Sequence, residues 1–131
     1  MSKLPLTNSA RTEWIYKVMD QDDWVKAQAH PTYSGSADDR RDGFVHLSAS
    51  HQLEGTLAQH FAGRANLALI AFPVDRLGQA LRWEASRAGE LFPHLHGPLP
   101  VAAAVRQWLL PLGPNGRHLL PELPGPEAST A

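Results

Sequence analysis

The sequence predicts a single α+β domain with a mixed or split β-sheet, and three observations support this. At 131 residues the chain is long enough for one domain with a core. Helical spacing of apolar residues is confined to the first half, where two helices are expected. Short runs rich in aromatic and branched residues dominate the second half. Early helices followed by successive strands favour an α+β domain over a doubly wound fold.

The composition excludes several classes of protein. The formal net charge is -1, so nothing favours nucleic acid or an anionic membrane as a partner. Cysteine is absent, which excludes disulfides, zinc-thiolate sites and thiol nucleophiles. No apolar run is long enough to span a membrane, and the first residues lack the apolar stretch of a signal peptide. We therefore expect a cytoplasmic location.

The folded unit is expected to cover residues 13–112. Residues 1–12 are small, polar and interrupted by proline, so we expect them to be disordered. Residues 113–131 are rich in proline and glycine and are expected to form a tail.

The first half of this unit predicts a strand, a helix, a loop, a strand and a second helix. Trp14–Val18 is rich in aromatic and branched residues and predicts a strand. Asp20 is a suitable N-cap for a helix that continues to about Ala29. Residues 32–42 are polar and predict a long functional loop. The second strand is expected over Phe44–Ser48, and the second helix runs from an N-cap at Ser50 to Gly63.

The second half predicts three strands. The continuous apolar run Leu67–Val74 predicts a central strand buried on both faces. A further strand is expected over Ala80–Ser86. The last lies within 101–110, with Val105 and Trp108 as its anchors.

His46 is the first candidate for chemistry, since it lies inside an apolar strand. Strand alternation places its side chain on the same face as that of Ser48. The imidazole then acts as a general base oriented by the serine hydroxyl, or it hydrogen-bonds a ligand. The alternative is a core histidine satisfied by a backbone carbonyl.

His94 and His96 lie between Pro93 and Pro98. In an extended segment both imidazoles share one face, a spacing that suits a metal if His46 or Glu84 supplies a third ligand. The alternative, which we favour, is a rigid proline-bounded turn with His94 pointing inward.

Glu84 is the third candidate, and it lies on the same predicted strand face as Arg82, with Arg87 nearby. Its carboxylate either points into a cleft, where it binds a ribose hydroxyl or stabilises a cationic transition state, or forms a surface salt bridge.

These residues lie in blocks that resemble the DUF952 family, small bacterial proteins of unknown function. The most specific blocks are Asp42–Ser48, which includes Asp-Gly-Phe-Val-His-Leu-Ser, and Gly89–Leu99, which includes Phe-Pro-His-Leu-His-Gly-Pro-Leu. Shorter matches occur around Trp14, Trp24 and Leu81, and the resemblance covers about residues 14–110.

This family is distantly similar to the ADP-ribosyltransferase-like superfamily, whose split sheet forms a cleft that holds NAD. The resemblance implies that Lys17, His46 with Ser48, and Glu84 occupy the three functional positions. The lysine departs from that pattern, because it supplies only donors and suits a phosphate or a carboxylate.

Three hypotheses for function follow. In the first, the chain is an ADP-ribosyltransferase-like enzyme or a binder of NAD-type nucleotides, with NAD as substrate. Glu84 then stabilises an oxocarbenium-like state, His94 closes the pocket, and Tyr33 stacks on a ring of the nucleotide, while Arg87 and His96 are further ligand contacts. In the second, the same cleft belongs to a non-catalytic module for a small ligand or a protein. In the third, His46, His94 and His96 form a metal-dependent enzyme.

Overall fold

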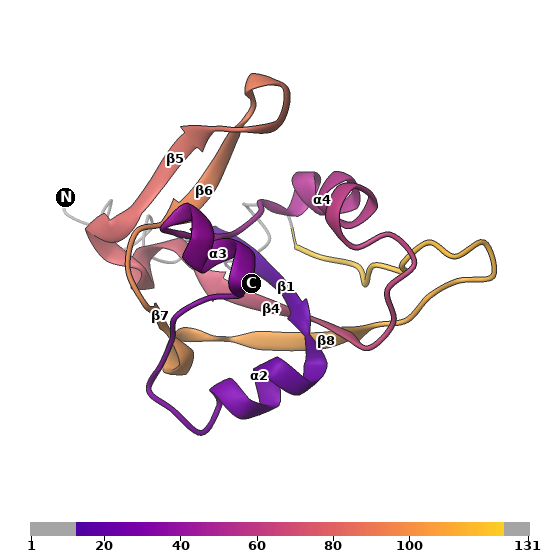
Figure 1. Cartoon of the computed structure of the whole chain (residues 1–131), viewed down its shortest axis with the longest axis horizontal. Helices are drawn as coiled ribbons and strands as arrows, with labels where there is room; N and C mark the ends of the chain where they lie inside the picture. Colours follow the sequence, from indigo (N-terminus) through magenta and orange to yellow (C-terminus); the bar gives the residue numbers. More distant parts are fainter. Residues whose placement is uncertain (1–12, 125–131) are drawn as a thin grey trace, which may run out of the picture.

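The structure, a computed structural model, describes residues 13–124 (Figure 1). The largest sheet has the order β1-β4-β8 and is formed by β1 (Trp14–Asp20), β4 (Leu67–Pro73) and β8 (Arg106–Leu110). A second sheet has the order β3-β6-β5 and is formed by β3 (Val45–His46), β6 (Leu91–Leu95) and β5 (Leu81–Ala85). A small sheet pairs β2 (Thr32–Tyr33) with β7 (Leu99–Pro100). All pairings are antiparallel.

Three α-helices connect these strands: α2 (Gln21–Ala27), α3 (Ala37–Asp42) and α4 (Leu53–His60). Turns of 3-10 helix complete the chain at Ser50–Gln52, Val74–Arg76, Gly78–Ala80, Arg87–Gly89 and Val101–Ala103. No helix in residues 13–124 is long and apolar enough to cross a membrane.

Strand β4 is the centre of the fold, as its continuous apolar sequence predicts. All its residues are buried, and it pairs with β1 on one edge and β8 on the other. Since side chains alternate along a strand, Ala68, Ile70 and Phe72 enter one core and the residues between them enter another. The sheet therefore has a separate hydrophobic cluster on each face.

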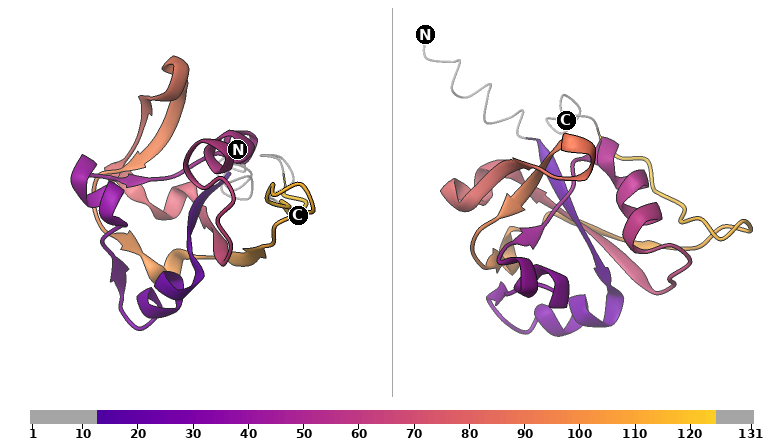
Figure 2. Two further views of the ribbon diagram at one scale, coloured as in Figure 1. Left: turned by 45° about the vertical axis from the view of Figure 1, so that its right-hand side comes forward. Right: turned by 45° about the horizontal axis from the view of Figure 1, so that its top comes forward.

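Helix α2 covers the first of these clusters (Figures 1 and 2). Its N-cap is Asp20, as predicted, whose carboxylate accepts a hydrogen bond from the Asp22 N–H. Trp24 is buried and packs edge-on against Phe72, with ring centroids 6.4 Å apart. The helix ends at Ala27, before the histidine and proline that limit it.

Helix α4 covers the second cluster with Leu53 and Leu57. The chain beyond residue 112, expected as a tail, contributes to this core, because Leu120 and Leu123 pack against it. A 3-10 turn over Ser50–Gln52 precedes the helix, so the expected N-cap at Ser50 is wrong. The N-cap of that turn is Ala49, whose N–H donates to the Gln52 side chain.

The segment 45–48 passes from one sheet to the other. Val45 and His46 pair with β6, and the Leu47 N–H donates to the Pro93 carbonyl at 3.1 Å. Ser48 then forms a bridge with Tyr16 of β1, through two backbone hydrogen bonds of 2.8 and 2.9 Å. The expected strand over Phe44–Ser48 is thus divided between two sheets, and the candidate site lies where these sheets part. The separate helices and antiparallel sheets confirm the α+β class.

Three further expectations are wrong. Residues 32–42 form β2 and α3 rather than one loop, because Ser36 and Asp39 form a capping box that starts a helix. The proline-bounded segment expected as a turn is mostly β6, the central strand of its sheet. Val105, expected as an anchor, is 39% exposed and precedes β8.

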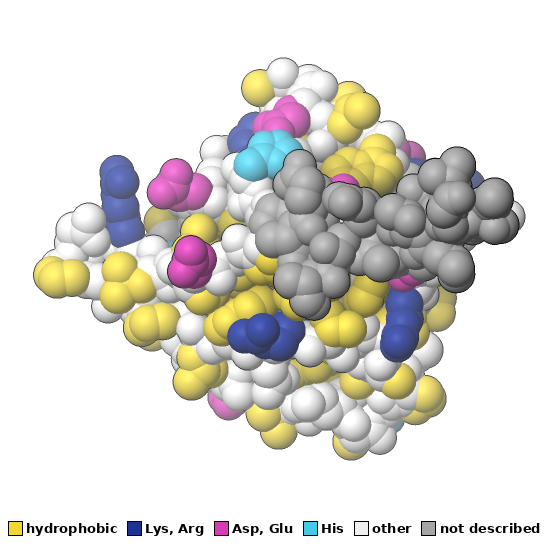
Figure 3. All heavy atoms as spheres, turned by 180° about the vertical axis from the view of Figure 1, so that it is seen from behind, with side chains coloured by type: hydrophobic (Ala, Val, Ile, Leu, Met, Phe, Trp, Pro, Cys, Tyr) yellow, Lys and Arg dark blue, Asp and Glu magenta, His cyan; other side chains and the backbone are white. Residues whose placement is uncertain are grey.

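The surface carries scattered apolar and charged groups. Seen from behind, Figure 3 shows hydrophobic side chains lying between polar ones, with charged groups spaced apart on that face. The large hydrophobic side chains with the most exposure are Val25, Trp83, Leu91, Val105, Leu109 and Leu119. The face in Figure 3 therefore offers no single-sign surface to a polyanion.

Candidate functional site

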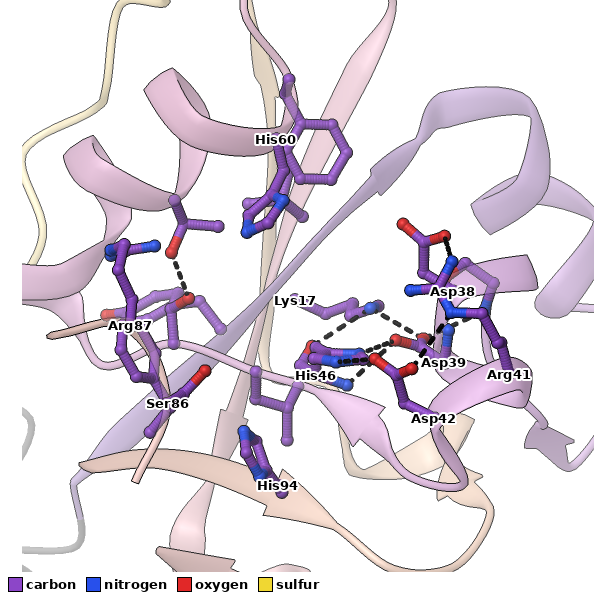
Figure 4. A pocket seen from close by; sticks show the side chains of 18 residues that line it. Lys17, Asp38, Asp39, Arg41, Asp42, His46, His60, Ser86, Arg87 and His94 are labelled. Atoms are coloured by element: carbon purple, nitrogen blue, oxygen red, sulfur yellow. Dashed lines mark hydrogen bonds and ion pairs between the residues drawn. The ribbon is translucent and has the colours of Figure 1, made fainter. Parts of the chain in front are cut away.

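A cavity of about 230 Å³ lies where the two sheets part. Its walls come from β1, α3, β3, α4, β6 and the turn at residues 86–87 (Figure 4). Lys17, Ser48, His46 and His94 all contribute to its lining, together with Arg87. The structure therefore gathers most of the residues selected from the sequence around one space.

A buried ion pair occupies the α3 end of the cavity. The Lys17 ammonium lies 2.8 Å from the Asp39 carboxylate, and both side chains are almost fully buried. Lys17 also donates to the backbone carbonyl of His46 at 3.1 Å. Asp39 accepts further hydrogen bonds from the Ser36 N–H, the His46 N–H and the His46 ring.

These contacts favour the charged form of each member of the pair. Burial alone raises the pKa of Asp39, yet the hydrogen bond from His46 and the charge of Lys17 outweigh it and hold that pKa well below its usual range. Burial lowers the pKa of Lys17, and the Asp39 carboxylate opposes this. Lys17 is therefore already engaged by protein groups and is not free to bind a phosphate.

His46 lies between two carboxylates. Its Nδ1 is 2.6 Å from Asp39, and its Nε2 is 3.0 Å from Asp42. The hydrogen bond from Arg41 is the first cause of the lowered pKa of Asp42. Both ring nitrogens of His46 thus face a carboxylate, so neither is directed at the cavity without a protein partner, as a general base requires.

Ser48 does not orient His46, so that expected pairing is wrong. Its hydroxyl lies 2.9 Å from the Thr56 hydroxyl of α4. Both residues line the cavity, but the serine is tied to the helix while the histidine is tied to α3.

His94 has the arrangement that His46 lacks. Its Nδ1 lies 2.8 Å from the Glu84 carboxylate, and the same oxygen lies 2.8 Å from His96 Nε2. His94 is buried and stacks on Phe44, with ring centroids 4.1 Å apart. No residue in 13–124 bonds its Nε2, and the ring lines the cavity (Figure 4). A carboxylate on Nδ1 fixes the tautomer that leaves Nε2 as an acceptor.

Glu84 and His96 lie behind this ring rather than in the cavity wall. Hydrogen bonds from His96 and then from His94 lower the pKa of Glu84. The sequence expectation that both histidines share one face is confirmed, because both contact the same oxygen. The expected direct contact of Glu84 with a ligand is not supported, because the imidazole of His94 lies between them.

Arg87 and Tyr33 have different positions. Arg87 lines the cavity with its guanidinium 4.7 Å from the Phe92 ring centroid. Tyr33 lies in β2 beside a second hollow, lined also by Lys26 and Arg40, and burial raises its pKa to about 12. Tyr33 thus does not line the main cavity, and its expected stacking on a ring of the nucleotide stays a prediction.

Asp39 and Asp42 were not selected from the sequence, because residues 32–42 were expected to be a loop. The signal that finds them is the spacing of Ser36 and Asp39, which matches a capping box at the start of a helix. That helix turns Asp39 towards Lys17 and His46.

The three histidines of the metal hypothesis do not form a ligand set. No group of three or more His, Asp or Glu side chains in residues 13–124 is arranged to hold a metal ion. Instead, His46, His94 and His96 each direct a ring nitrogen at a carboxylate.

The fold and site thus define a small α+β protein with a polar cavity between two antiparallel sheets. The chain belongs to the family described as protein of unknown function (DUF952), which matches residues 18–107. It is similar to protein CC0527 from Caulobacter crescentus. The crystal structure of that protein has 44% sequence identity and a TM-score of 0.77, over 81% of this chain and 93% of that chain. Its solution NMR structure has 45% identity and a TM-score of 0.72, over 79% and 90% of the two chains. No curated protein matches.

Proposed function

We propose that this chain binds the nicotinamide-ribose part of an NAD-type nucleotide in the cavity between the sheets. The open edge of β1 at Val18 carries the proposal. Tyr16 exchanges backbone hydrogen bonds with Ser48 on that edge, and residues two apart on a strand present their backbone groups to the same edge. The N–H and C=O of Val18 therefore face the gap.

Val18 is buried and lines the cavity, and no residue in 13–124 pairs with it on that edge. A buried backbone donor and acceptor without partners are costly. A primary carboxamide offers one acceptor and one donor with matching spacing, so nicotinamide completes both hydrogen bonds.

The size of the cavity limits what enters it. Its volume of about 230 Å³ is below the roughly 300–1,000 Å³ of pockets that enclose drug-sized ligands. It suits one ring with part of a sugar, and the remainder of a dinucleotide then extends from the mouth.

His94 is the acid–base group of this proposal. In the transferase reaction the bond between C1′ of the ribose and the nicotinamide nitrogen breaks, and nicotinamide leaves as a neutral molecule. The oxygen of water or of an acceptor hydroxyl bonds to C1′, and its proton passes to Nε2 of His94. Glu84 stabilises the imidazolium that results. In this proposal His94 makes the direct contact with the ligand that the sequence analysis suggested for Glu84.

The second candidate is a binding module without chemistry, favoured by the complete pairing of Lys17 and His46. The two candidates differ in what His94 does. His94→Gln abolishes nicotinamide release under the first candidate and leaves ligand affinity within a few-fold under both.

The experiment is calorimetric titration with nicotinamide and with nicotinic acid, followed by an assay of nicotinamide release from NAD. Nicotinic acid has lost the donor N–H, so we expect it to bind at least about fivefold more weakly, one hydrogen bond being worth roughly 1 kcal/mol or more. His30→Gln, an exposed histidine outside this cavity, is the control. Equal binding of both compounds, or no binding of either, contradicts the proposal.

A further inference from the structure

The two ends of the cavity differ in how their charged groups are paired. At the α3 end, Lys17, Arg41 and His46 each contact a carboxylate. At the α4 end, Arg87 and His60 line the cavity, together with the Ser86 hydroxyl (Figure 4). No residue in 13–124 forms a salt bridge or hydrogen bond with these three side chains. The α4 end thus offers donors that the protein itself does not use.

The carboxylate of Glu90 is affected by the charge of Arg87, but its hydrogen bonds are made with other side chains. It contacts His51 and Gln52, each at 3.0 Å. Hydrogen bonds from Gln52 lead the causes of its lowered pKa, and the charge of Arg87 is among the smaller ones. The charge of Arg87 therefore acts on Glu90, although the N–H groups of its guanidinium donate no hydrogen bond to that carboxylate.

Arg87 is held in place by packing on two sides. Its guanidinium lies over the Phe92 ring, with 4.7 Å to the ring centroid. On the other side it approaches Gly55 of α4, where an added Cβ would lie 2.9 Å from one guanidinium nitrogen. The side chain of this arginine thus extends from the turn at residues 86–87 to α4, across one end of the cavity.

Gly55 has no conformational reason to be glycine. It lies within α4, and its backbone is not in the left-handed region. A glycine inside a helix is destabilising relative to alanine. The close approach of Arg87 supplies the reason, because a methyl group at this position displaces the guanidinium.

We propose that Arg87, Ser86 and His60 form a phosphate subsite at the α4 end, so that the ligand of this cavity is a phosphorylated nucleotide. The proposal rests on the proposed function, which places the ring and sugar of the ligand beside His94 and Val18. Arginine suits the role because its planar guanidinium donates two parallel hydrogen bonds to a phosphate. The serine hydroxyl and the imidazole add donors from two other directions.

The test compares nicotinamide mononucleotide with nicotinamide riboside, which lacks only the phosphate, by calorimetric titration. We expect the phosphate to improve affinity by about tenfold to a hundredfold, the range of a charge-assisted hydrogen bond. Arg87→Gln should remove this preference, while Arg76→Gln, an exposed arginine outside the cavity, should keep it. Gly55→Ala should also weaken the preference while raising the melting temperature, which separates displacement of Arg87 from damage to the fold.

Retention of the preference in Arg87→Gln overturns the subsite. If neither nicotinamide compound binds, the proposed function fails. Titration with inorganic pyrophosphate then tests the phosphate subsite by itself. Binding of pyrophosphate that is lost in Arg87→Gln and kept in Arg76→Gln supports the subsite on its own. Absence of pyrophosphate binding to the unmodified chain overturns it.

Discussion

Replacing Asp39 by Asn leaves a buried lysine charge without its partner. The carboxylate of Asp39 lies 2.8 Å from Lys17, and the exposed fractions of the two side chains are 1% and 6%. Removing one member of a buried pair costs about 3–5 kcal/mol, because the other charge stays desolvated. This is a large part of the roughly 5–15 kcal/mol by which a domain is stable. The corresponding fall in melting temperature is about 12–20 °C for a domain of this size.

The assay is urea and thermal unfolding at pH 7, followed by circular dichroism. Asp38→Asn is the matched control, because its side chain is 68% exposed and pairs with an exposed arginine. Adding Lys17→Met to Asp39→Asn removes the stranded charge and should recover part of the lost stability. A loss below about 1 kcal/mol in the single variant would refute the argument that the buried pair is charged.

The carboxylate of Asp39 should also make the stability of the fold depend on pH. Its pKa in the folded state is lowered, by the His46 hydrogen bond and the Lys17 charge acting against burial. Its contribution to stability is therefore complete above the pKa that Asp39 has in the unfolded chain, about 3.9. The contribution is lost as the pH falls below that value. Asp39→Asn should flatten this part of the stability curve.

Three further predictions concern the elements around the site, each measured by urea unfolding. Leu53→Ala should cost about 2–5 kcal/mol because the residue is fully buried, whereas Leu109→Ala, 63% exposed, should change stability by less than about 0.5 kcal/mol. Ser36→Ala should cost about 0.5–2 kcal/mol through loss of the α3 cap. Gly43→Ala should cost about 1–2 kcal/mol because of its left-handed φ of 88°, and Gly35→Ala should cost more, because its Cβ would lie 2.5 Å from a side-chain atom of α3. Equal losses at the two glycines would contradict the role of that contact.

Strong local patterns accounted for the parts of the fold that the sequence predicted. The apolar run of β4 and the cap at Asp20 each have a direct physical cause within a few residues. Helix α3 was missed because its one buried side chain is a carboxylate, Asp39, so no apolar periodicity marks it. Strand β6 was missed because Pro93 lies at its centre, and proline is a signal against a central strand.

The sequence selected some of the residues that line the cavity, but not their contacts. An unusual sequence context was enough to select His46, Glu84 and His94. Which histidine keeps a free nitrogen depends on the position of Asp39, which is fixed by tertiary pairing. The position of Tyr33 outside the cavity wall has the same cause, since β2 pairs with β7, a strand much later in the chain.

Pro93 has a consequence for the opening between the sheets. It accepts a hydrogen bond from Leu47 and has no N–H with which to return one, so the seam between β3 and β6 stops there. The next residue, Ser48, pairs with Tyr16 instead. An ordinary residue in place of Pro93 would complete the pair with Leu47, while the backbone groups of Ser48, which face the opposite edge, would still pair with Tyr16. The missing N–H therefore leaves the rim of the hollow joined to β6 by one hydrogen bond where an ordinary ladder has two.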